Sequence, residues 1–388
     1  MIAHLQSNEA ARIAAFPVAA ESVFMAHAGV TILPRRVTHV MQAYLEESCR
    51  RHQEYPEAWK AVLETRVLAA KMIGAQPQEI ALLGPTSVGL NLVSIGLPWQ
   101  PGDEVVCYLD DYPANVYPWT ELQRRGVVVK FLQPDQLGGI TPDLVERALS
   151  PRTKLVALAS CHFLTGNRIQ IDVIGQMLRS RGIYFCLDAI QTIGAFETLV
   201  NHVDFLSADS HKWMLGPMSA GIVYVRESLH EVLRPALLGS WNVCSPNFIA
   251  QEEIAFEKGG RRFEPGAMNM AGILGMKAGI ELLLEAGVDN ISQHLLTMRQ
   301  GLTAALEPLG WEFFPIVDGC LPSGILTGRP GGKTEEEMTS LFAHFTANKI
   351  VVSHRFDRTG RSYFRFSPHF YNTPAEVHRI AQCLQSVG

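Results

Sequence analysis

The first feature of the chain is a series of short apolar runs, separated by amphipathic stretches, between residues 79 and 225. Several runs are continuously apolar rather than alternating, as expected of strands that are covered on both faces. Helix-like segments such as 141–150 and 171–182 separate them, which predicts a mostly parallel sheet with right-handed crossovers. The predicted strands are 79–83, 104–109, 127–132, 154–160, 184–190, 203–209 and 220–225.

The pattern changes on either side of this region. Apolar residues recur at helical spacing over 36–51, and a second helix is predicted over 57–73. After about residue 235 an irregular stretch runs to 270, and a long helix over 271–286 precedes further helices and a few strands. The sequence therefore predicts an N-terminal segment (1–30), a large α/β domain (31–260), and a linker helix with a smaller C-terminal α+β domain (261–388).

Composition and charge narrow the class of protein. The chain has 388 residues, of which 47% are apolar, and a formal net charge of −5. These apolar residues are too many and too evenly spread for a disordered chain. No apolar run approaches the roughly 18 residues of a membrane span. The slightly acidic balance gives no reason to expect a nucleic-acid or polyanion partner.

The N-terminal sequence and the cysteines predict where the protein works. Residues 1–21 lack a basic start followed by a sustained apolar stretch, so we expect no signal peptide. The seven cysteines include no C-x-x-C pair, and most lie in apolar, strand-like segments. This usage is typical of thiols in a reducing cytosol and predicts a cytoplasmic globular protein.

Four segments place polar side chains just beyond predicted strand ends, where open α/β sheets bind their ligands. The first is GPTSVGLN at 84–91, in which Thr86 and Ser87 open a helix. Free backbone N–H groups and two hydroxyls at a helix N-terminus suit a phosphate, although the same residues also serve as ordinary N-caps. The chain contains no convincing P-loop or dinucleotide-binding motif.

The second segment, YFCLDAIQTIGA at 184–195, brings a carboxylate to the end of an apolar strand. Asp188 closes the strand and Gln191 follows three residues later. A carboxylate at this position either binds a ligand or caps the next helix, and the segment alone favours neither.

The third segment, FLSADSHKWMLGP at 205–217, places Lys212 directly after a buried strand, between His211 and Trp213. A lysine is rare in so enclosed a place, and desolvation lowers its pKa toward nucleophilic use. The alternative is a lysine whose aliphatic stem lies along the indole while its charge reaches solvent.

The fourth segment, SYFRFSPHFYN at 362–372, has Arg365 within an aromatic strand. An inward-facing arginine among aromatic residues suits a carboxylate, although an internal ion pair would also account for it. Together the four segments describe one reaction centre. It has a Schiff-base lysine, a carboxylate for a pyridine nitrogen, a phosphate site and an arginine for a substrate carboxylate.

With these residues the chain resembles pyridoxal-phosphate-dependent enzymes of fold type I, in the class V aminotransferase family. That group includes cysteine desulfurases, selenocysteine lyases, isopenicillin-N-epimerase-like proteins and kynureninase. The resemblance spans about 20–385 and is strongest at D-A-x-Q-x-x-G-A (188–195) and H-K-W-x-x-G-P (211–217). It implies the fold-type-I architecture, with a mostly parallel seven-stranded sheet and a smaller C-terminal α+β domain.

The resemblance assigns cofactor contacts residue by residue. It implies that Lys212 forms the Schiff base with pyridoxal phosphate, that Asp188 pairs with the pyridine nitrogen and that Gln191 contacts the phenolic oxygen. The remaining cofactor-binding residues that it implies are Thr86, Ser87 and His211 at the phosphate, Tyr112 stacked on the ring, and Ser160 near the ring.

Two positions depart from the family pattern. Asp209 stands where some relatives have a Ser near the phosphate, and an acidic side chain there would repel it, so we expect Asp209 to face elsewhere. Segment 261–269 resembles the stretch that relatives contribute to the neighbouring subunit's phosphate site, where a Thr is common. Here that position is Ala267, which leaves only backbone N–H groups for the contact.

The substrate side of the site is predicted from three segments. Arg365 matches the arginine that binds the substrate carboxylate in this family, and Arg355, His27 and Ala28 are further candidates for the substrate pocket. In the desulfurases a catalytic cysteine lies shortly before that arginine. Residues 350–365 contain no cysteine, which argues against the usual persulfide route.

The resemblance therefore implies a pyridoxal-phosphate enzyme, a lyase or transferase, that acts at Cα or Cβ of an amino acid. We expect a C–S lyase that works by β-elimination through a Lys aldimine and a quinonoid, without a persulfide cysteine. An aminotransferase or an amino-acid epimerase is the alternative, and a non-catalytic α/β binding protein is a more distant one. We expect a homodimer with shared active sites, a small amino-acid substrate, and no metal, nucleic-acid or membrane partner.

Overall fold

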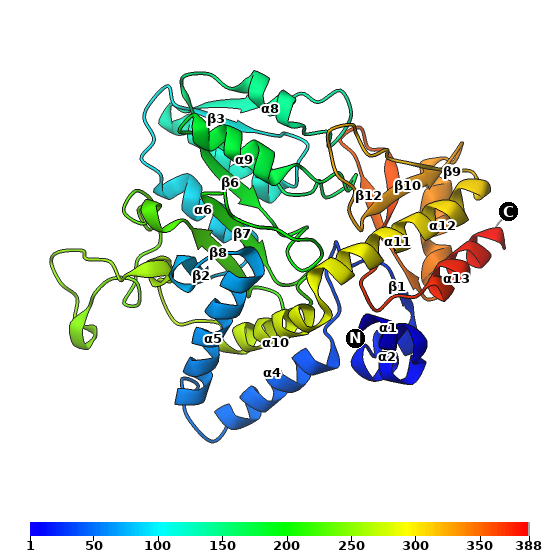
Figure 1. The fold of residues 1–388 in the computed structure, drawn as a ribbon, viewed down its shortest axis with the longest axis horizontal. Coiled ribbons are helices and arrows are strands. Elements are labelled where there is room, and N and C mark those ends of the chain that lie inside the picture. The colour runs from blue at the N-terminus through cyan, green and yellow to red at the C-terminus, as the bar shows by residue number, and fades with distance from the viewer. Residues whose placement is uncertain (387–388) are drawn as a thin grey trace.

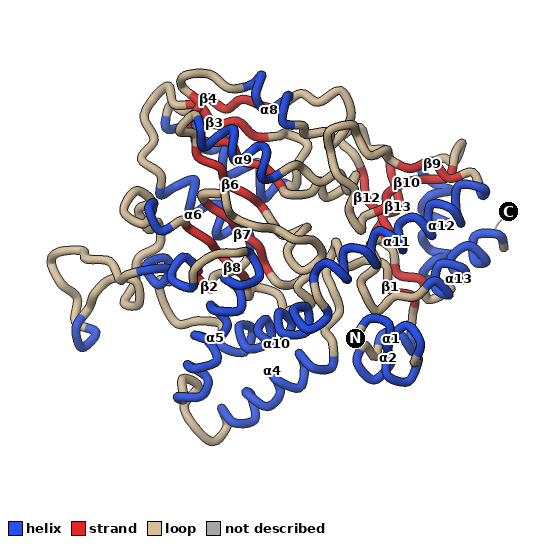
Figure 2. The backbone as a smooth tube through the Cα atoms, in the orientation of Figure 1, coloured by secondary structure: helices blue, strands red, loops and turns tan. Residues whose placement is uncertain are grey.

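The computed structural model describes residues 1–386. Its large sheet contains seven strands: β2 (Ile80–Leu82), β3 (Glu104–Cys107), β4 (Val128–Phe131), β5 (Thr153–Ala159), β6 (Tyr184–Asp188), β7 (Phe205–Asp209) and β8 (Gly221–Val225). They lie in the order β2-β8-β7-β6-β5-β3-β4 (Figures 1 and 2). β8 runs antiparallel to the other six strands, and all pairings that do not involve β8 are parallel. The predicted mostly parallel sheet is confirmed, and each strand falls within its predicted range except β5, which begins one residue early.

Apolar side chains fill both faces of this sheet. Along β5, Leu155 and Ala157 belong to one buried cluster, whereas Val156 and Leu158 belong to another on the opposite face. Because consecutive side chains of a strand point to opposite faces, a strand covered on both sides must be apolar throughout. This explains the continuous apolar runs in the sequence.

Helices supply these two covers. They are α4 (Arg35–Ser48), α5 (Pro56–Ile73), α6 (Thr86–Gly96), α7 (Tyr117–Thr120), α8 (Pro142–Ala148), α9 (Ile171–Ser180) and α10 (Met270–Ala286). α10 packs against α4 and α5, below the sheet in Figure 1, and α6 packs on β7. The long helix predicted over 271–286 is α10. It connects the large sheet to the C-terminal part of the chain and packs on the helices of the large sheet.

The C-terminal part is a smaller α+β unit. Its sheet has the order β12-β13-β10-β9 and is antiparallel. The strands are β9 (Trp311–Phe313), β10 (Leu326–Pro330), β12 (Ser353–Phe356) and β13 (Ser362–Phe366), and the helices are α11 (Val288–Leu306), α12 (Glu335–Ala347) and α13 (Pro374–Gln385). Buried aromatic side chains, including Phe345, Phe364 and Phe366, form its core.

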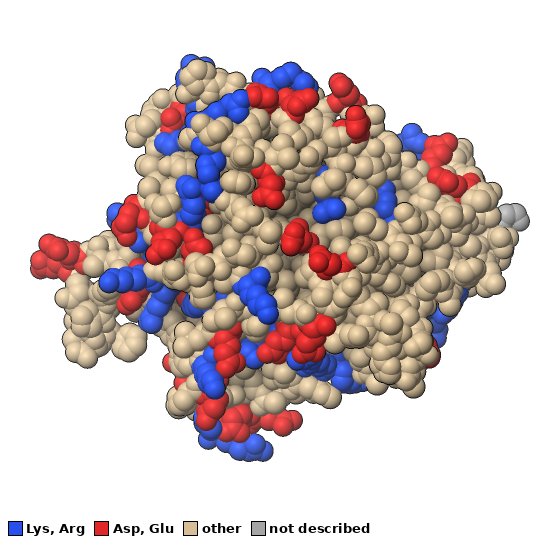
Figure 3. All heavy atoms as spheres, viewed as in Figure 1, with Lys and Arg blue, Asp and Glu red and all other residues tan. Residues whose placement is uncertain are grey.

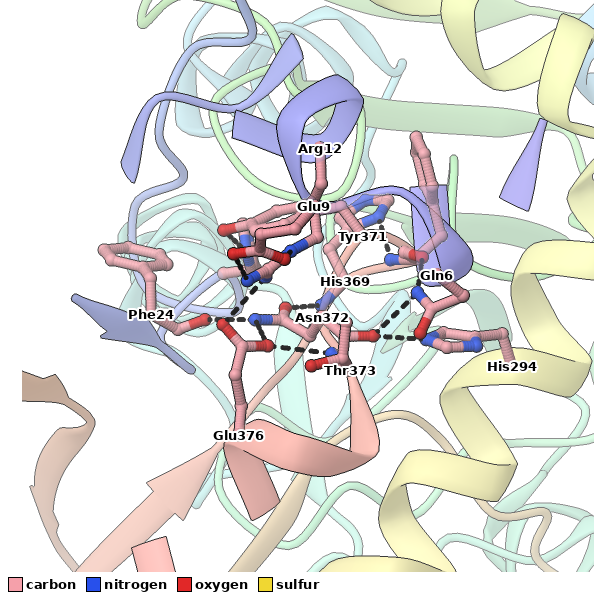
Figure 4. Close-up of polar contacts among 12 residues, drawn as sticks. Gln6, Glu9, Arg12, Phe24, His294, His369, Tyr371, Asn372, Thr373 and Glu376 are labelled. Carbon is pink, nitrogen blue, oxygen red and sulfur yellow. Dashed lines mark hydrogen bonds and ion pairs between the residues drawn. The ribbon is translucent and has the colours of Figure 1, made fainter. Parts of the chain in front are cut away.

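The N-terminal segment attaches to this smaller unit. It contains α1 (Ile2–Ser7), α2 (Glu9–Ala15), α3 (Val18–Glu21) and β1 (Val23–Phe24), and β1 pairs in parallel with β11 (Ile350–Val351). Arg12 forms a buried ion pair with Glu376 of α13 at 3.0 Å, and Glu376 also accepts hydrogen bonds from Asn372 and Thr373 (Figure 4). The two ends of the chain are therefore held together.

The surface carries both charges. On the face in Figure 3, Lys and Arg side chains are interspersed with Asp and Glu, so this face does not present the continuous basic stripe that polyanion binding uses. Within residues 1–386, every helix is too short or too polar to cross a bilayer.

Candidate active site

A cavity of about 300 Å³ lies beyond the carboxyl ends of β6 and β7, and β12 and β13 of the C-terminal sheet contribute side chains to it. Ten of the residues predicted from the sequence line it: Ala28, Thr86, Ser87, Tyr112, Asp188, Gln191, His211, Lys212, Arg355 and Arg365. Because β6 and β7 are parallel neighbours, the residues that follow them meet at the same edge of the sheet. The cavity thus gathers residues that lie far apart in the sequence.

Asp188 and Lys212 are buried ionisable residues that line the cavity. Lys212 is 7% exposed, and burial together with the nearby charge of Arg365 lowers its pKa to about 8. Burial raises the pKa of Asp188 to about 6, although a hydrogen bond from the backbone N–H of Ile190 to its Oδ1 at 3.1 Å opposes this. At neutral pH, Asp188 is therefore mostly ionised and a usable fraction of Lys212 is uncharged.

Of the phosphate-binding residues predicted from the sequence, Thr86 and Ser87 lie at the N-terminus of α6 and His211 lies in the loop after β7. The backbone N–H of Asp209 donates to Oγ1 of Thr86 at 2.9 Å, which leaves the Thr86 hydroxyl hydrogen free for a ligand. Asp209 itself does not line the cavity: its Oδ2 contacts Nδ1 of His211 and accepts from the backbone N–H of Ser219. The Asp209 carboxylate is therefore held by His211 and Ser219, outside the cavity lining.

Two arginines face the cavity without an acidic partner. Arg365 is 1% exposed, and its Nη1 donates to the backbone oxygen of Phe163 at 2.5 Å. Within residues 1–386 neither Arg365 nor Arg355 forms an ion pair, and the Nε atoms of both are buried without a hydrogen bond. Burial and the charge of Arg355 lower the pKa of Arg365 to about 9. A bound anion would relieve both effects.

Tyr112 and Phe163 form the aromatic side of the cavity. Nζ of Lys212 lies 5.3 Å from the centroid of the Tyr112 ring, and that ring meets Phe163 edge to face at 5.6 Å. Phe163 was not singled out from the sequence, because the loop over 159–168 has no periodicity to show which of its residues face inward. Because Tyr112 lies next to Lys212, its ring is placed where it could stack on the ring of a cofactor bound to that lysine.

The structure places Ser160 and His27 outside the cavity lining. The hydroxyl of Ser160 accepts from Oγ1 of Thr192 at 2.9 Å, so it is engaged in the core. His27 is fully buried, with Nδ1 2.7 Å from the Thr31 hydroxyl and Nε2 3.1 Å from the Tyr371 hydroxyl. Its neighbour Ala28 lines the cavity instead.

Asp111 is a buried acid next to the site that the sequence analysis missed. It accepts hydrogen bonds from the backbone N–H groups of Tyr112 at 2.7 Å and Ala159 at 3.2 Å, and from Nδ2 of Asn115 at 3.1 Å. Burial and the charge of Asp188 raise its pKa to about 7. A signal for Asp111 was present in the sequence. Asp110 and Asp111 directly follow the predicted strand 104–109, and Asp188 likewise lies at the end of a strand.

The chemistry of this donor set fits pyridoxal phosphate. Lys212 can hold an aldehyde, Asp188 can pair with a protonated ring nitrogen, and the free hydroxyls and N–H groups at the start of α6 can bind a phosphate. All seven cysteines lie within the described residues, and none of them lines the cavity.

Comparisons with known proteins agree with this geometry. A family model described as "Aminotransferase class-V" matches residues 23–318. A probable cysteine desulfurase of Methanothermobacter thermautotrophicus is 27% identical, with 96% of each chain covered. An uncharacterized aminotransferase of Bacillus subtilis, YcbU, is 25% identical, with 93% of each chain covered.

Solved structures share the fold. The apo cysteine desulfurase of Thermococcus onnurineus superposes with a TM-score of 0.89 at 23% identity, covering 97% of each chain. The cystine C–S lyase C-DES, in complex with its product cysteine persulfide, superposes with a TM-score of 0.86 at 18% identity, covering 95% of this chain and 98% of its own.

Proposed function

The chain belongs to the class-V aminotransferase family of pyridoxal-phosphate-dependent enzymes, and on this premise we propose that it is a C–S lyase. In the proposed reaction, a sulfur substituent leaves Cβ of an amino acid such as a cysteine conjugate or cystine. The thiol leaves with the electrons of the C–S bond, the Cα proton is removed, and water converts the remaining fragment to pyruvate and ammonium. The reaction needs no external oxidant or reductant.

Four charged residues of the cavity have a part in this proposal. When bound, pyridoxal phosphate supplies the electron sink for the electron pair left at Cα. Lys212 would hold the aldehyde of the cofactor and, when its amine is free, would take the Cα proton; its pKa of about 8 suits a base near neutral pH. The carboxylate of Asp188 would keep the ring nitrogen protonated. Arg365 binds the substrate carboxylate, and Arg355 offers a second cation to an acidic substituent.

One observation carries the choice of elimination over sulfur transfer: none of the residues that line the cavity is a cysteine. A persulfide route needs a thiolate within reach of the substrate sulfur. Cys107, Cys161 and Cys320 are buried in the core, and burial raises their pKa values to between about 11 and 12. Burial of this kind favours the thiol over the nucleophilic thiolate.

We also propose that the enzyme is a cytoplasmic homodimer. The loop over 236–258, yellow-green at the left of Figure 1, extends from the body of the molecule and exposes Phe248, which is 78% exposed, together with Ile249 and Ile254. Exposed apolar side chains gathered on one projecting segment are typical of interfaces. The segment over 261–269, which follows this loop, is the proposed contribution to the partner's phosphate site. Seven free cysteines fit a reducing compartment.

The experiment that tests the proposed reaction is a product assay on the purified holoenzyme. With cystine or S-substituted cysteines and no 2-oxo acid, we expect pyruvate and ammonium in equal amounts. Lys212→Ala should abolish both turnover and the Schiff-base absorbance, whereas Asp188→Asn should bind the cofactor but turn over at least 100-fold more slowly, the scale of a lost general acid–base contribution.

Other products would contradict elimination. Alanine from cysteine, with a persulfide detected on one of the seven cysteines by mass spectrometry, would mean desulfuration. A requirement for a 2-oxo acid would mean transamination, and loss of optical activity without release of sulfur would mean epimerisation.

A further inference from the structure

Gln191 and Trp213 form a buried pair beside the cavity, and the hydrogen bonds of this pair orient one amide group. Nε1 of Trp213 donates to Oε1 of Gln191 at 2.9 Å, and Nε2 of Gln191 donates to the backbone oxygen of Ala28 at 3.1 Å. Gln191 and Ala28 line the cavity. Trp213 directly follows Lys212 but lies behind the lining, fully enclosed.

The chemistry of the two neighbours permits one orientation of the amide. An indole N–H can only donate a hydrogen bond, and a backbone carbonyl can only accept one. If the amide of Gln191 were rotated by half a turn, its NH₂ group would face the indole N–H and its oxygen would face the oxygen of Ala28. Two buried hydrogen bonds would then be replaced by two repulsive contacts, so the amide oxygen stays with Trp213.

Trp213 is itself held from the C-terminal part of the chain. The backbone N–H of Phe370 donates to Nδ1 of His369 at 2.9 Å, which places the imidazole proton on Nε2. Nε2 of His369 then donates to the backbone oxygen of Trp213 at 3.0 Å. Burial lowers the pKa of His369 to about 4, so the ring is neutral and keeps this tautomer. The successive hydrogen bonds therefore all point the same way along the chain of contacts that begins at Phe370 and ends at Gln191.

This arrangement leaves one hydrogen of the Gln191 NH₂ group for a ligand. Ala28 takes the other hydrogen, and no residue within 1–386 accepts the second one. We propose that Trp213 is a positioning residue: by holding the amide oxygen, it makes Gln191 present a donor, not an acceptor, to the phenolic oxygen of pyridoxal phosphate. The inference deepens the proposed function and rests on its cofactor assignment.

The consequence is measurable in the titration of the Schiff base. The Schiff-base nitrogen shares its proton with the phenolic oxygen, and a second donor on that oxygen weakens its hold on the proton. Losing the donor should therefore raise the apparent pKa of the Schiff base. A hydrogen bond to a charged oxygen corresponds to about 1 to 2 pH units.

The experiment is a pH titration of the Schiff-base absorbance in four forms of the holoenzyme. Relative to the wild type, Trp213→Phe should raise the apparent pKa by up to about 2, because the amide can then rotate. Gln191→Leu, which removes the amide, should raise it at least as much. In the double variant, Trp213→Phe should add nothing to Gln191→Leu, since Trp213 acts only through that amide.

Two controls separate positioning from packing. Trp99→Phe removes another buried indole hydrogen bond, 2.7 Å from Nε1 to the oxygen of Ser94 and away from the cavity, and should leave the titration unchanged. If Trp213→Phe does not fold, 3-benzothienylalanine at position 213 keeps the bicyclic shape and removes only the N–H. It should reproduce the rise in the apparent pKa.

The outcomes are distinguishable. A wild-type protein that forms no Schiff base with pyridoxal phosphate overturns the cofactor assignment and this inference with it. A Schiff base that titrates alike in the wild type and in the Trp213 variants overturns the inference alone. So does an effect of Trp213→Phe that persists in the Gln191→Leu background, because it would then reach the cofactor by another route.

Discussion

Burial, more than any single contact, determines the behaviour of the ionisable residues in the cavity. It lowers the pKa of Lys212 and raises the pKa of Asp188, which brings both close to neutrality. Arg365 strengthens the effect on Lys212, because a neighbouring positive charge disfavours a second one. The same residues on an exposed surface would stay fully charged at neutral pH and would lack this reactivity.

The pH dependence of cofactor binding should report the lowered pKa of Lys212. Only uncharged Lys212 attacks the aldehyde, so the rate at which apoenzyme combines with pyridoxal phosphate should rise with pH through about 8. We expect this rate to increase roughly fivefold between pH 7 and pH 8 and to reach a plateau above about pH 9. Stopped-flow absorbance measures the rate.

A variant of Arg365 provides the control for this prediction. Arg365→Met removes the positive neighbour, so the pKa of Lys212 should rise and the plateau should move to higher pH. A wild-type rate that climbs about tenfold per pH unit up to pH 10 would contradict the prediction, because it would indicate an unperturbed lysine.

At the scale of elements, the attachment of the N-terminal helices depends on a few buried polar contacts. Glu376 lies in the first turn of α13, where it accepts from the backbone N–H of Thr373 at 2.8 Å and from Asn372 at 3.0 Å. Arg12 of α2 neutralises its charge at 3.0 Å (Figure 4). The residues that follow α2 in the chain, Ala28 among them, reach the cavity.

Removal of Arg12 should therefore be costly. Arg12→Ala leaves the carboxylate of Glu376 buried without its cation, and we expect a loss of about 3 kcal/mol in the free energy of unfolding. Denaturant unfolding followed by circular dichroism measures this. Arg36→Ala, which breaks the exposed pair with Glu285, is the matched control and should cost less than about 1 kcal/mol. Equal losses in the two variants would refute the role of the buried pair.

At the scale of the whole molecule, the cavity exists because two parts of the chain close on each other. The large sheet supplies Asp188 and the loop after β7 supplies Lys212, whereas β12 and β13 supply Arg355 and Arg365. Arg358, in the turn between those two strands, also forms an ion pair with Asp110 and donates to the backbone oxygen of Leu109 at 2.8 Å. These contacts join the two parts beside the cavity.

Dimerisation is the prediction that belongs to this scale. We expect light scattering of the holoenzyme to give twice the mass of the 42.9 kDa chain. Replacing Phe248 and Ile249 with Asp should shift the protein toward the monomer and weaken cofactor retention, because a charged residue is disfavoured in an apolar interface. Val173→Asp, at an exposed apolar position of α9, should leave the mass unchanged. A fully active monomer would contradict the prediction.

The secondary structure was the most predictable part of the molecule. Short apolar runs identified all seven strands of the large sheet, and several of these runs are continuous because a strand covered on both faces must be apolar along its length. Element ends were less certain: the strand predicted over 184–190 ends at Asp188, because the side chain of Asp188 accepts a hydrogen bond from the backbone of Ile190 and the chain turns there.

The sequence by itself determined the elements of the fold and the chemical types in the site, because apolar periodicity and residue chemistry are local properties of the chain. Which residues of the irregular loops face the cavity was decided only by the tertiary structure. Phe163 faces it and Ser160 does not, and the buried acid Asp111 and the orientation of the Gln191 amide depend on neighbours that are distant in the chain. Irregular loops have no period from which a direction can be inferred, and hydrogen bonds between distant segments form only once the chain has folded.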